Sequence, residues 1–415
     1  MGIQQLMPVL EVASNRLLTE LTGARGQGDE LFSALTSEAI YLRPIAERHR
    51  VIFYLGHLDG FDSIQICREG LGQKSPDPGL DDLFQAGIDP DAGQLPKDTP
   101  GDWPSVEQVK AYVERCRRRV DDSLNRVPEE AMYMALEHRL MHLETLAYMF
   151  HNFPFEAKRA PRSYNPSIAV GAHRDNEWRE IPAGEAVLGQ ARGTAFGWDN
   201  EFGEVRRQMP AFRIQRFPIS NGEYLQFVRA GAALPHFWRQ KGEELFLRGM
   251  FAETPLPLDG PVYVTELEAE AYAAWMGKRL MTEAEFHRAA YATPSGENRP
   301  YPWGVSEPSH ERGNFDFKTW DTESVYSTPA GDSALGVSQL VGNGWEWTST
   351  TFGPFPGFEQ RPSYPGYSAN FFDNEHYVLK GGSSRTAARL LRSSFRNWFR
   401  RDYPYLYGKF RCVDR

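Results

Sequence analysis

The segment EEAMYMALEHRLMHLETLAYMFHNF, residues 129–153, carries the clearest helical pattern in the chain. Its apolar residues recur at spacings of three and four, which predicts one long helix. His138 and His142 lie four residues apart in this segment, so their side chains project from one face, one helical turn apart. Two imidazoles placed in this way can bind a single metal ion. The spacing alone is weak evidence, because two ordinary histidines can share it by chance.

Three earlier segments show the same spacing of apolar residues. They are residues 9–24, 48–71 and 105–127, and together with 129–153 they predict a four-helix bundle. The connection at residues 72–105 is rich in Pro, Gly and Asp and is long for a loop between bundle helices. A connection of this length within a compact domain is usually functional or flexible.

The pattern changes after the bundle. Residues 156–182 carry prolines and little periodicity, which indicates a linker. Residues 183–415 alternate short apolar runs with Gly, Pro and Asn, and helices are expected at 220–231 and 265–280. The sequence therefore predicts an α+β protein of two domains, with the helical bundle at residues 1–155 and an irregular, turn-rich domain after the linker.

The composition narrows the class of protein. The 415 residues carry a net charge of −9 with acidic and basic residues interspersed, which argues against a nucleic-acid or membrane partner. Cys67, Cys116 and Cys412 are too far apart in sequence to suggest a disulfide framework or a cysteine-rich zinc site. The N-terminal residues do not resemble a signal peptide, and no apolar run is long enough to span a bilayer. We therefore expect a cytoplasmic protein.

A third histidine strengthens the metal hypothesis. His57 interrupts the apolar run VIFYLGHLDGF at residues 51–61. One histidine in such a run is more often a core residue than a ligand, but three on the inward stripes of one bundle favour a shared metal. Three neutral imidazoles suit zinc or iron and leave positions open for substrate and oxygen. Glu144 lies two residues after His142, about 200° around the helix, so we expect it to support the ligands or the fold rather than bind the metal.

At these residues the chain resembles a known family. HLD at 57–59 and HRLMHLE at 138–144 are similar to the DinB-like domain of ergothioneine sulfoxide synthases (EgtB type). The second half is similar to the formylglycine-generating-enzyme, or sulfatase-modifying-factor, domain fused to it. The matching stretches are FGWDNE (196–201), FPISNGEYLQFV (217–228), MGKRLMTEAEF (276–286), YPWG (301–304), GNGWEWTS (342–349), LKGGS (379–383), FRNW (395–398) and GKFRC (408–412). They follow the order of the family and span nearly the whole chain.

The resemblance implies a DinB-like four-helix bundle joined to a C-type-lectin-like domain. It also implies that Fe(II) is bound by His57, His138 and His142. The implied reaction uses O2 to join the sulfur of a small thiol to C2 of the imidazole of hercynine, which is trimethylhistidine, and yields a sulfoxide.

The resemblance also assigns residues to the substrates. Asn397 and Trp398 match the family's residues for the trimethylammonium group, which aromatic faces recognise. Tyr364 aligns with a tyrosine that donates a proton or a hydrogen bond near the metal. Each of these residues would also be compatible with plain packing in a domain rich in aromatic side chains.

Two departures from the family pattern leave the sulfur donor open. Phe399 follows Asn-Trp where members that use γ-glutamylcysteine have Asp, so we do not expect a charged clamp on a dipeptide amine. Met141 precedes the last ligand where some members have Gln, and HLET at this place is closer to the ovothiol-forming (OvoA-type) 5-histidylcysteine sulfoxide synthases. Those enzymes lack FRNW and carry a methyltransferase domain. We expect Phe399 and Met141 to contact substrate, and cysteine, another small thiol, or a selenosugar, as in selenoneine synthases (SenA-type), would each fit.

Two other classes of function remain open. A metal-dependent thiol S-transferase, which DinB-like bundles also support, would use zinc or nickel and no oxygen. A binding or scaffolding protein with a lectin-like domain would need no metal. Formylglycine generation itself is not expected, because Cys412 alone cannot provide the paired cysteines that bind copper.

Overall fold

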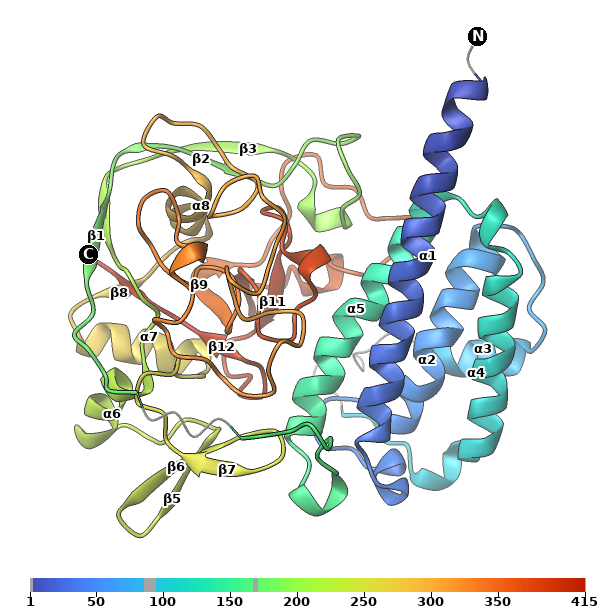
Figure 1. Cartoon of the computed structure of the whole chain (residues 1–415), viewed down its shortest axis with the longest axis horizontal. Coiled ribbons are helices and arrows are strands. Elements are labelled where there is room, and N and C mark those ends of the chain that lie inside the picture. The colour runs from blue at the N-terminus through green and yellow to red at the C-terminus, as the bar shows by residue number, and fades with distance from the viewer. Residues whose placement is uncertain (1–2, 86–94, 167–170, 415) are drawn as a thin grey trace. The chain divides into compact units, whose positions relative to one another are not determined.

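The chain forms two compact units in a computed structural model, Met1–Ser163 and Tyr164–Arg415 (Figure 1). The structure describes residues 3–85, 95–166 and 171–414, with side chains from residue 15 onward. The first unit is helical, whereas the second combines short strands with three short α-helices among its described residues. This arrangement confirms the predicted α+β class with two domains.

Four long helices make up the bundle of the first unit. They are α1 (Ile3–Ser33), α2 (Val51–Ser63), α4 (Val106–Asp121) and α5 (Glu129–His151), with the shorter α3 (Pro78–Gln85), a π-helical turn η2 (Ile64–Glu69) and the 3-10 turns η1 (Ser37–Tyr41), η3 (Pro100–Asp102), η4 (Leu124–Arg126) and η5 (Phe155–Ala157). Helix α1 packs on α5, and α2 packs on α4, α3 and α5. The four long helices confirm the four segments predicted from the sequence.

Helix α3 lies inside the segment for which the sequence predicts only a connection. Pro78 opens the helix, at a position where its missing N–H costs no hydrogen bond. The Asp77 carboxylate accepts a hydrogen bond from the Leu80 N–H at 3.3 Å, in the manner of a helix cap. An Asp-Pro pair followed by apolar residues is thus the local signal for this helix.

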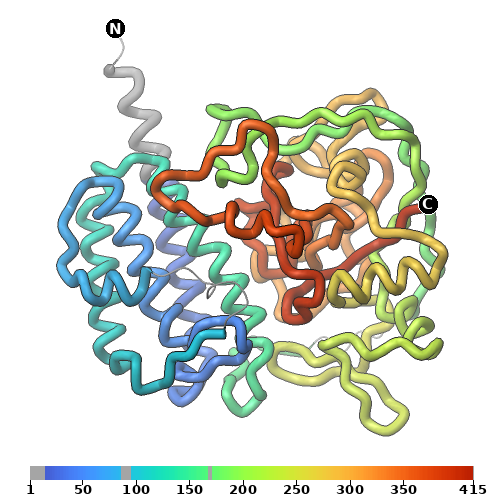
Figure 2. Tube along the Cα trace, turned by 180° about the vertical axis from the view of Figure 1, so that it is seen from behind, coloured from blue at the N-terminus to red at the C-terminus, as the bar shows by residue number. Residues whose placement is uncertain are grey.

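Thirteen strands form four sheets in the described part of the second unit. The strands are β1 (Trp178–Ile181), β2 (Gly184–Leu188), β3 (Val205–Met209), β4 (Phe212–Gln215), β5 (Trp238–Lys241), β6 (Glu244–Arg248), β7 (Glu253–Pro255), β8 (Arg279–Leu280), β9 (Trp345–Thr351), β10 (His376–Lys380), β11 (Asn397–Arg400), β12 (Gly408–Lys409) and β13 (Cys412–Val413). The sheet orders are β1-β4-β13-β8, β11-β10-β9-β12, β2-β3 and β5-β6-β7. The end of the chain therefore returns to the strands that open this unit, as Figure 2 shows from behind.

The helices of this unit are α6 (Asn221–Arg229), α7 (Glu266–Trp275) and α8 (Glu283–Tyr291), with the 3-10 turns η6 (Asp199–Glu201), η7 (Pro329–Gly331), η8 (Ala369–Phe371) and η9 (Ala388–Leu390). Helix α6 confirms the prediction at 220–231. The prediction at 265–280 is too long, because Gly277 adopts a positive φ of 68° and ends α7. The chain then enters β8.

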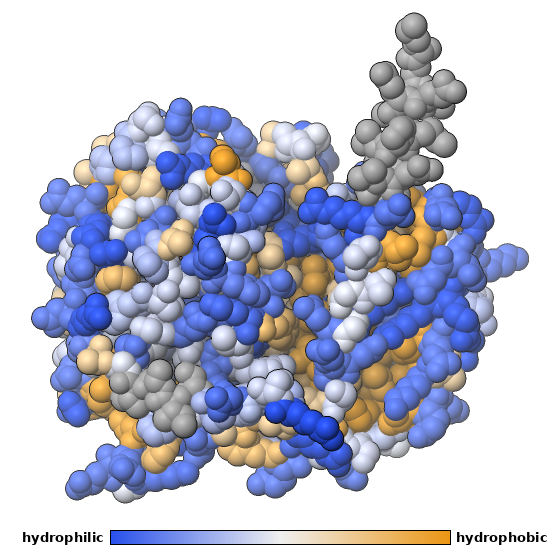
Figure 3. All heavy atoms as spheres, in the orientation of Figure 1, coloured by the Kyte–Doolittle hydropathy of each residue, from blue (hydrophilic) through white to orange (hydrophobic). Residues whose placement is uncertain are grey.

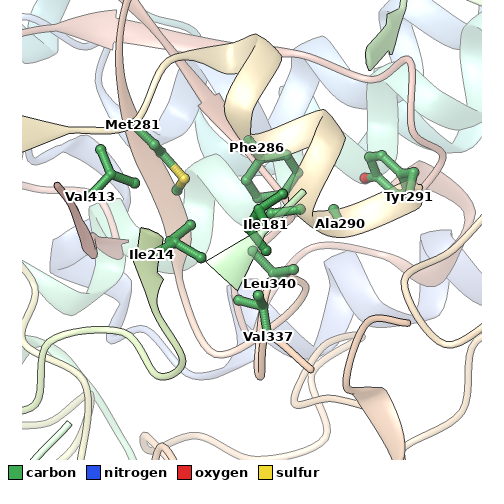
Figure 4. Close-up of a cluster of buried hydrophobic side chains, with 10 residues drawn as sticks. Ile181, Ile214, Met281, Phe286, Ala290, Tyr291, Val337, Leu340 and Val413 are labelled. Atoms are coloured by element: carbon green, nitrogen blue, oxygen red, sulfur yellow. The ribbon is translucent and has the colours of Figure 1, made fainter. Parts of the chain in front are cut away.

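Helix α8 supplies the core of the second unit. Phe286 and Tyr291 from α8 pack with Ile181, Ile214 and Val413 of β1, β4 and β13, all of them buried (Figure 4). This helix is not among those predicted from the sequence, although Thr282 and Glu285 form a capping box in which the Thr282 hydroxyl accepts from the Glu285 N–H. The cap places the apolar side of α8 on the sheet.

Buried ion pairs join several of the quoted motifs of the second half to one another. Glu346 of GNGWEWTS accepts hydrogen bonds from Arg411 of GKFRC at 2.6 Å and forms an ion pair with Lys409 at 3.1 Å. Arg396 of FRNW binds both oxygens of Glu283 at 2.9 and 3.1 Å. These residues therefore fix segments distant in sequence to one another, since a buried charge requires its partner.

The face shown in Figure 3 is mostly hydrophilic, in keeping with the acidic composition. Among the residues that the structure describes, none of the helices is long and apolar enough to cross a membrane. The three cysteines are all buried and unbridged.

Candidate metal centre

Three histidine rings meet in the interior of the bundle. The Nε2 atoms of His57 and His142 lie 3.3 Å apart, and those of His142 and His138 lie 3.1 Å apart. One ligand atom from each residue lies within 4.8 Å of both others, and all three residues are buried. The structure thus brings together the three residues expected to bind the metal, His57 from α2 and His138 and His142 from α5.

The spacing of the three nitrogens fits one metal ion. Two imidazole nitrogens about 2.0–2.1 Å from a common ion, at angles of 90° to 110°, lie about 2.9–3.4 Å from each other. The two measured separations fall in this range. Because neutral imidazole nitrogens carry lone pairs that repel one another, a cation at their meeting point would stabilise the arrangement.

The electrostatic environment keeps these rings neutral. Burial, opposed by the Phe84 carbonyl, lowers the pKa of His57 to about 4. Burial and the other histidines hold the pKa values of His138 and His142 well below the ordinary range. Since a metal binds the unprotonated ring nitrogen, three neutral rings of this kind could bind one metal ion.

Aromatic side chains of α2 fix the orientation of the rings. Phe61 stacks on His138 with ring centroids 3.5 Å apart, and Phe53 stacks on His57 at 4.7 Å. Phe53, His57 and Phe61 follow one another at intervals of four residues, so they form one stripe along α2. The apolar run at 51–61 therefore provides both a ligand and the surfaces that hold the ligands.

A main-chain group also contacts the site. The Nδ1 atom of His57 lies 2.5 Å from the carbonyl oxygen of Phe84 in α3. A carbonyl can only accept, so Nδ1 carries the proton and the Nε2 lone pair is free.

Next to the ligands, a buried charge cluster joins α2 and α5. Arg139, which follows His138, donates to Asp59 at 2.7 Å and to Asp62 at 2.6 Å. Burial raises the pKa of Asp62 to about 6, whereas Arg139 and Arg117 lower the pKa of Asp59 against the effect of burial. No role was predicted for Asp59, the aspartate of HLD, from the sequence.

The cluster extends to the other two long helices. Arg117 of α4 donates to Asp59 at 3.1 Å and forms a paired contact with Asp29 of α1. Arg25 of α1 lies 3.7 Å from Asp59 and donates to Asp121 of α4 at 2.7 Å. All four long helices therefore share one charge network, which sets the register that brings the histidines together.

Two other residues of α5 were singled out from the sequence. Glu144 is buried and is not among the groups close enough to share the ion. Met141 is partly exposed and lies on the helix face near His138 and His142.

In the second unit, Tyr364 and Trp398 belong to one aromatic cluster. The ring of Tyr367 lies 5.8 Å from that of Tyr364 and 5.4 Å from that of Trp398, to which it is nearly perpendicular. Tyr367 also stacks on Trp198 at 4.2 Å, and Trp398 stacks on Phe352 at 4.3 Å. We call these five residues the aromatic cluster. Tyr367 is the member that joins the others, and sequence reasoning did not select it.

Polar contacts hold the loop that carries the two tyrosines. Between β9 and β10, the Ser368 hydroxyl donates to buried Asp199 at 2.6 Å, and Arg361 donates to the Gly197 carbonyl. These contacts bring the loop to the turn that contains Trp198. The FGWDNE segment thus positions Tyr364 and Tyr367 through its contacts with Arg361 and Ser368.

Asn397 and Phe399 lie differently from Trp398. The three are consecutive in β11, so the side chains of Asn397 and Phe399 project from the opposite face to that of Trp398. The Asn397 side-chain oxygen accepts from the Trp398 N–H at 2.9 Å, and Phe399 stacks on Tyr403 at 5.0 Å. The three residues of β11 that are expected to contact substrate therefore lie on two opposite faces of this edge strand.

Two family models match the chain in succession. Residues 20–152 match the DinB superfamily, and residues 172–415 match the sulfatase-modifying factor enzyme 1-like domain. These ranges correspond to the helical and the sheet-containing unit.

Three relatives are similar to most of this chain. Hercynine oxygenase of Mycobacterium tuberculosis is 32% identical, and the alignment covers 86% of this chain and 88% of that protein. Hercynine oxygenase of Mycolicibacterium smegmatis is 31% identical over 86% of this chain and 90% of that protein. Ergothioneine biosynthesis protein 1 of Neurospora crassa is 28% identical over 91% of this chain, which spans about half, 55%, of the fungal protein. The chain therefore belongs to the EgtB-type family, in which a DinB-like domain is fused to a sulfatase-modifying-factor-like domain.

Proposed function

We propose that this protein is an Fe(II)- and O2-dependent enzyme that joins C2 of the hercynine imidazole to the sulfur of a small thiol. One observation carries the proposal: three neutral imidazoles converge inside the bundle at separations that suit one ion. Family membership and the names of the relatives, hercynine oxygenase among them, supply the reaction class.

The proposed reaction balances with O2 as the oxidant. The C2–H and S–H bonds break, a C–S bond forms, one oxygen atom becomes the sulfoxide oxygen and the other leaves with both hydrogens as water. His57, His138 and His142 would hold the iron. Bound there, Fe(II) would supply the one-electron chemistry that O2 requires and would lower the pKa of the thiol.

The aromatic cluster would bind the trimethylammonium group of hercynine. A quaternary ammonium has no N–H to donate, so aromatic faces are its natural partners. Trp398 and Tyr367 are both partly exposed and stand nearly perpendicular, so they offer two walls of a corner. Tyr364, in contact with Tyr367, carries a hydroxyl that can donate a proton.

The sulfur donor would be a molecule other than γ-glutamylcysteine, because position 399 offers no carboxylate to the amine of that dipeptide. Phe399 presents an aromatic ring, stacked on Tyr403, where related enzymes for γ-glutamylcysteine have Asp. Stacked rings also suit the apolar face of a sugar. This contact favours a selenosugar donor as the second candidate, and a selenium analogue as its product.

The test is analysis of products by mass spectrometry. The Fe(II)-loaded protein is supplied with O2 and hercynine, and separately with cysteine, γ-glutamylcysteine and a selenosugar. We expect a hercynine adduct that needs both O2 and iron, with cysteine or the selenosugar preferred to γ-glutamylcysteine.

The controls separate the classes of function. His138→Ala protein and an anaerobic reaction should each give no adduct. Thiol transfer that proceeds without O2, with zinc or nickel, would identify an S-transferase. Protein that holds no metal and transforms neither substrate would instead be a binding protein.

A further inference from the structure

Helix α3 contacts the metal centre at one of its ligands. Phe84, which is fully buried, lies in the last turn of α3, where main-chain carbonyls are available to partners outside the helix. Its carbonyl accepts the hydrogen bond of the His57 Nδ1–H. The described residues offer no comparable partner to Nδ1 of His142. His57 is thus held by a main-chain group of a different helix.

Two glycines of α2 allow α3 to approach this closely. A Cβ atom on Gly56, the residue before His57, would lie 2.5 Å from the Phe84 ring. A Cβ atom on Gly60 would lie 2.9 Å from the Tyr112 hydroxyl and 3.5 Å from the Phe84 Cβ. Because glycine destabilises a helix interior, two of them one turn apart require a packing reason. Here the two glycines leave room for the side chains of Phe84 and Tyr112.

The opposite side of α3 is fixed to α4. The Tyr112 hydroxyl donates to buried Asp81 at 2.7 Å, and the Tyr112 ring stacks on that of Phe84 at 5.5 Å. Arg115 of α4 forms an ion pair with Asp77 at 3.1 Å. These contacts limit the movement of α3, so the carbonyl that faces His57 has a defined place.

We propose that α3 is a positioning element for the metal, with Gly56 as the positioning residue that admits it. The Phe84 carbonyl keeps the proton of His57 on Nδ1 and directs Nε2 towards the ion. The partial negative charge at a helix C-terminus strengthens the effect, since it raises the basicity of the liganding nitrogen. This inference rests on the proposed metal-dependent function and deepens it.

The experiment compares two glycine-to-alanine variants, Gly56→Ala in α2 and Gly26→Ala in α1, by anaerobic titration of the full chain with Co(II), followed by its visible absorption. Gly56→Ala should weaken Co(II) binding by about 10- to 100-fold, the range found when the partner of a liganding histidine is lost. Gly26→Ala is the matched control, because it adds the same methyl group to the interior of another long bundle helix, α1, at a position where a Cβ atom would meet nothing within 4 Å. We expect its affinity for Co(II) to stay within about threefold of the unsubstituted protein.

A compensating change tests the cause. Phe84→Leu keeps the main-chain carbonyl and removes the ring atoms that a Cβ on Gly56 would meet. The double variant Gly56→Ala with Phe84→Leu should therefore recover at least part of the lost Co(II) affinity. It can be measured even where Gly56→Ala alone does not fold.

Three results would overturn the proposal. Equal Co(II) affinity of folded Gly56→Ala and Gly26→Ala is the first. A folded double variant that binds as weakly as Gly56→Ala is the second. The third is unsubstituted protein that binds no Co(II) at the histidines, which would remove the proposed function as well and is recognised without any variant.

Discussion

The two units hold their candidate functional residues in different ways. In the first, the three histidines sit on two long helices, and a charge network through all four long helices sets their register. In the second, Tyr364 and Tyr367 lie on a loop, Trp198 on a turn and Trp398 on an edge strand. The first site stands on two regular helices, whereas the second depends on contacts among a loop, a turn and an edge strand. We therefore expect substitutions in the first unit to abolish function and substitutions in the second unit to reduce it by varying degrees.

The sharpest test of this difference is His138→Ala. With one of three ligands lost, the purified protein should lose its metal and its turnover, a larger effect than the roughly 100-fold upper range for supporting residues. Metal analysis by mass spectrometry and an activity assay measure both. His310→Ala, at an exposed histidine of the second unit, is the control. Retention of full metal content by His138→Ala would refute the assigned ligand set.

The next largest effect concerns the network that sets the helix register. Arg139→Met leaves Asp59 and Asp62 buried without their main partner, which should cost about 3–5 kcal/mol of unfolding free energy. Denaturant unfolding of the metal-free protein measures this loss. Arg16→Ala breaks an exposed ion pair with Glu20 and should cost no more than about 0.5 kcal/mol. Similar losses in both variants would show that the network does not stabilise the bundle.

In the second unit, Tyr364→Phe should separate chemistry from metal binding. Metal content should stay unchanged, while sulfoxide formation falls by about 100-fold or more if the hydroxyl transfers a proton. Single-turnover product analysis distinguishes a slower reaction from an altered product. Tyr326→Phe, outside the aromatic cluster, should leave both unchanged. An undiminished sulfoxide yield from Tyr364→Phe would exclude this role.

The smallest effect is expected at the aromatic wall. Trp398→Ala should raise KM for hercynine by about 2- to 30-fold, since a cation–π contact contributes about 0.5–2 kcal/mol. Trp398→Phe should retain part of the contact, and Trp275→Ala, at an exposed tryptophan, should change nothing. With histidine as the substrate, which carries a primary and not a quaternary ammonium, the Trp398→Ala penalty should be smaller. A penalty of equal size for both substrates would point to packing instead.

The same difference explains what could be predicted from the sequence. His138 and His142 share a helix, so a spacing of four residues indicated that they project from one face, and the four long helices followed from apolar periodicity. The Phe84 carbonyl could not be predicted, because a main-chain group has no residue-type signal. Tyr367 was missed although it lies three residues from Tyr364, because loops have no period that reveals which side chains meet. The division of Asn397 and Trp398 between two strand faces followed only once β11 was known.

The strand order of the second unit has a consequence for protein engineering. Strands β1 and β13 both border β4, so the start and the finish of this unit lie about 10 Å apart, two strand spacings. A module with adjacent ends can be attached to, or inserted into, another protein with little disturbance to either. Circular permutation that links residue 414 to residue 178 through a short glycine-serine bridge should thus preserve its sheets, and new ends could be opened at an exposed turn such as 242–243.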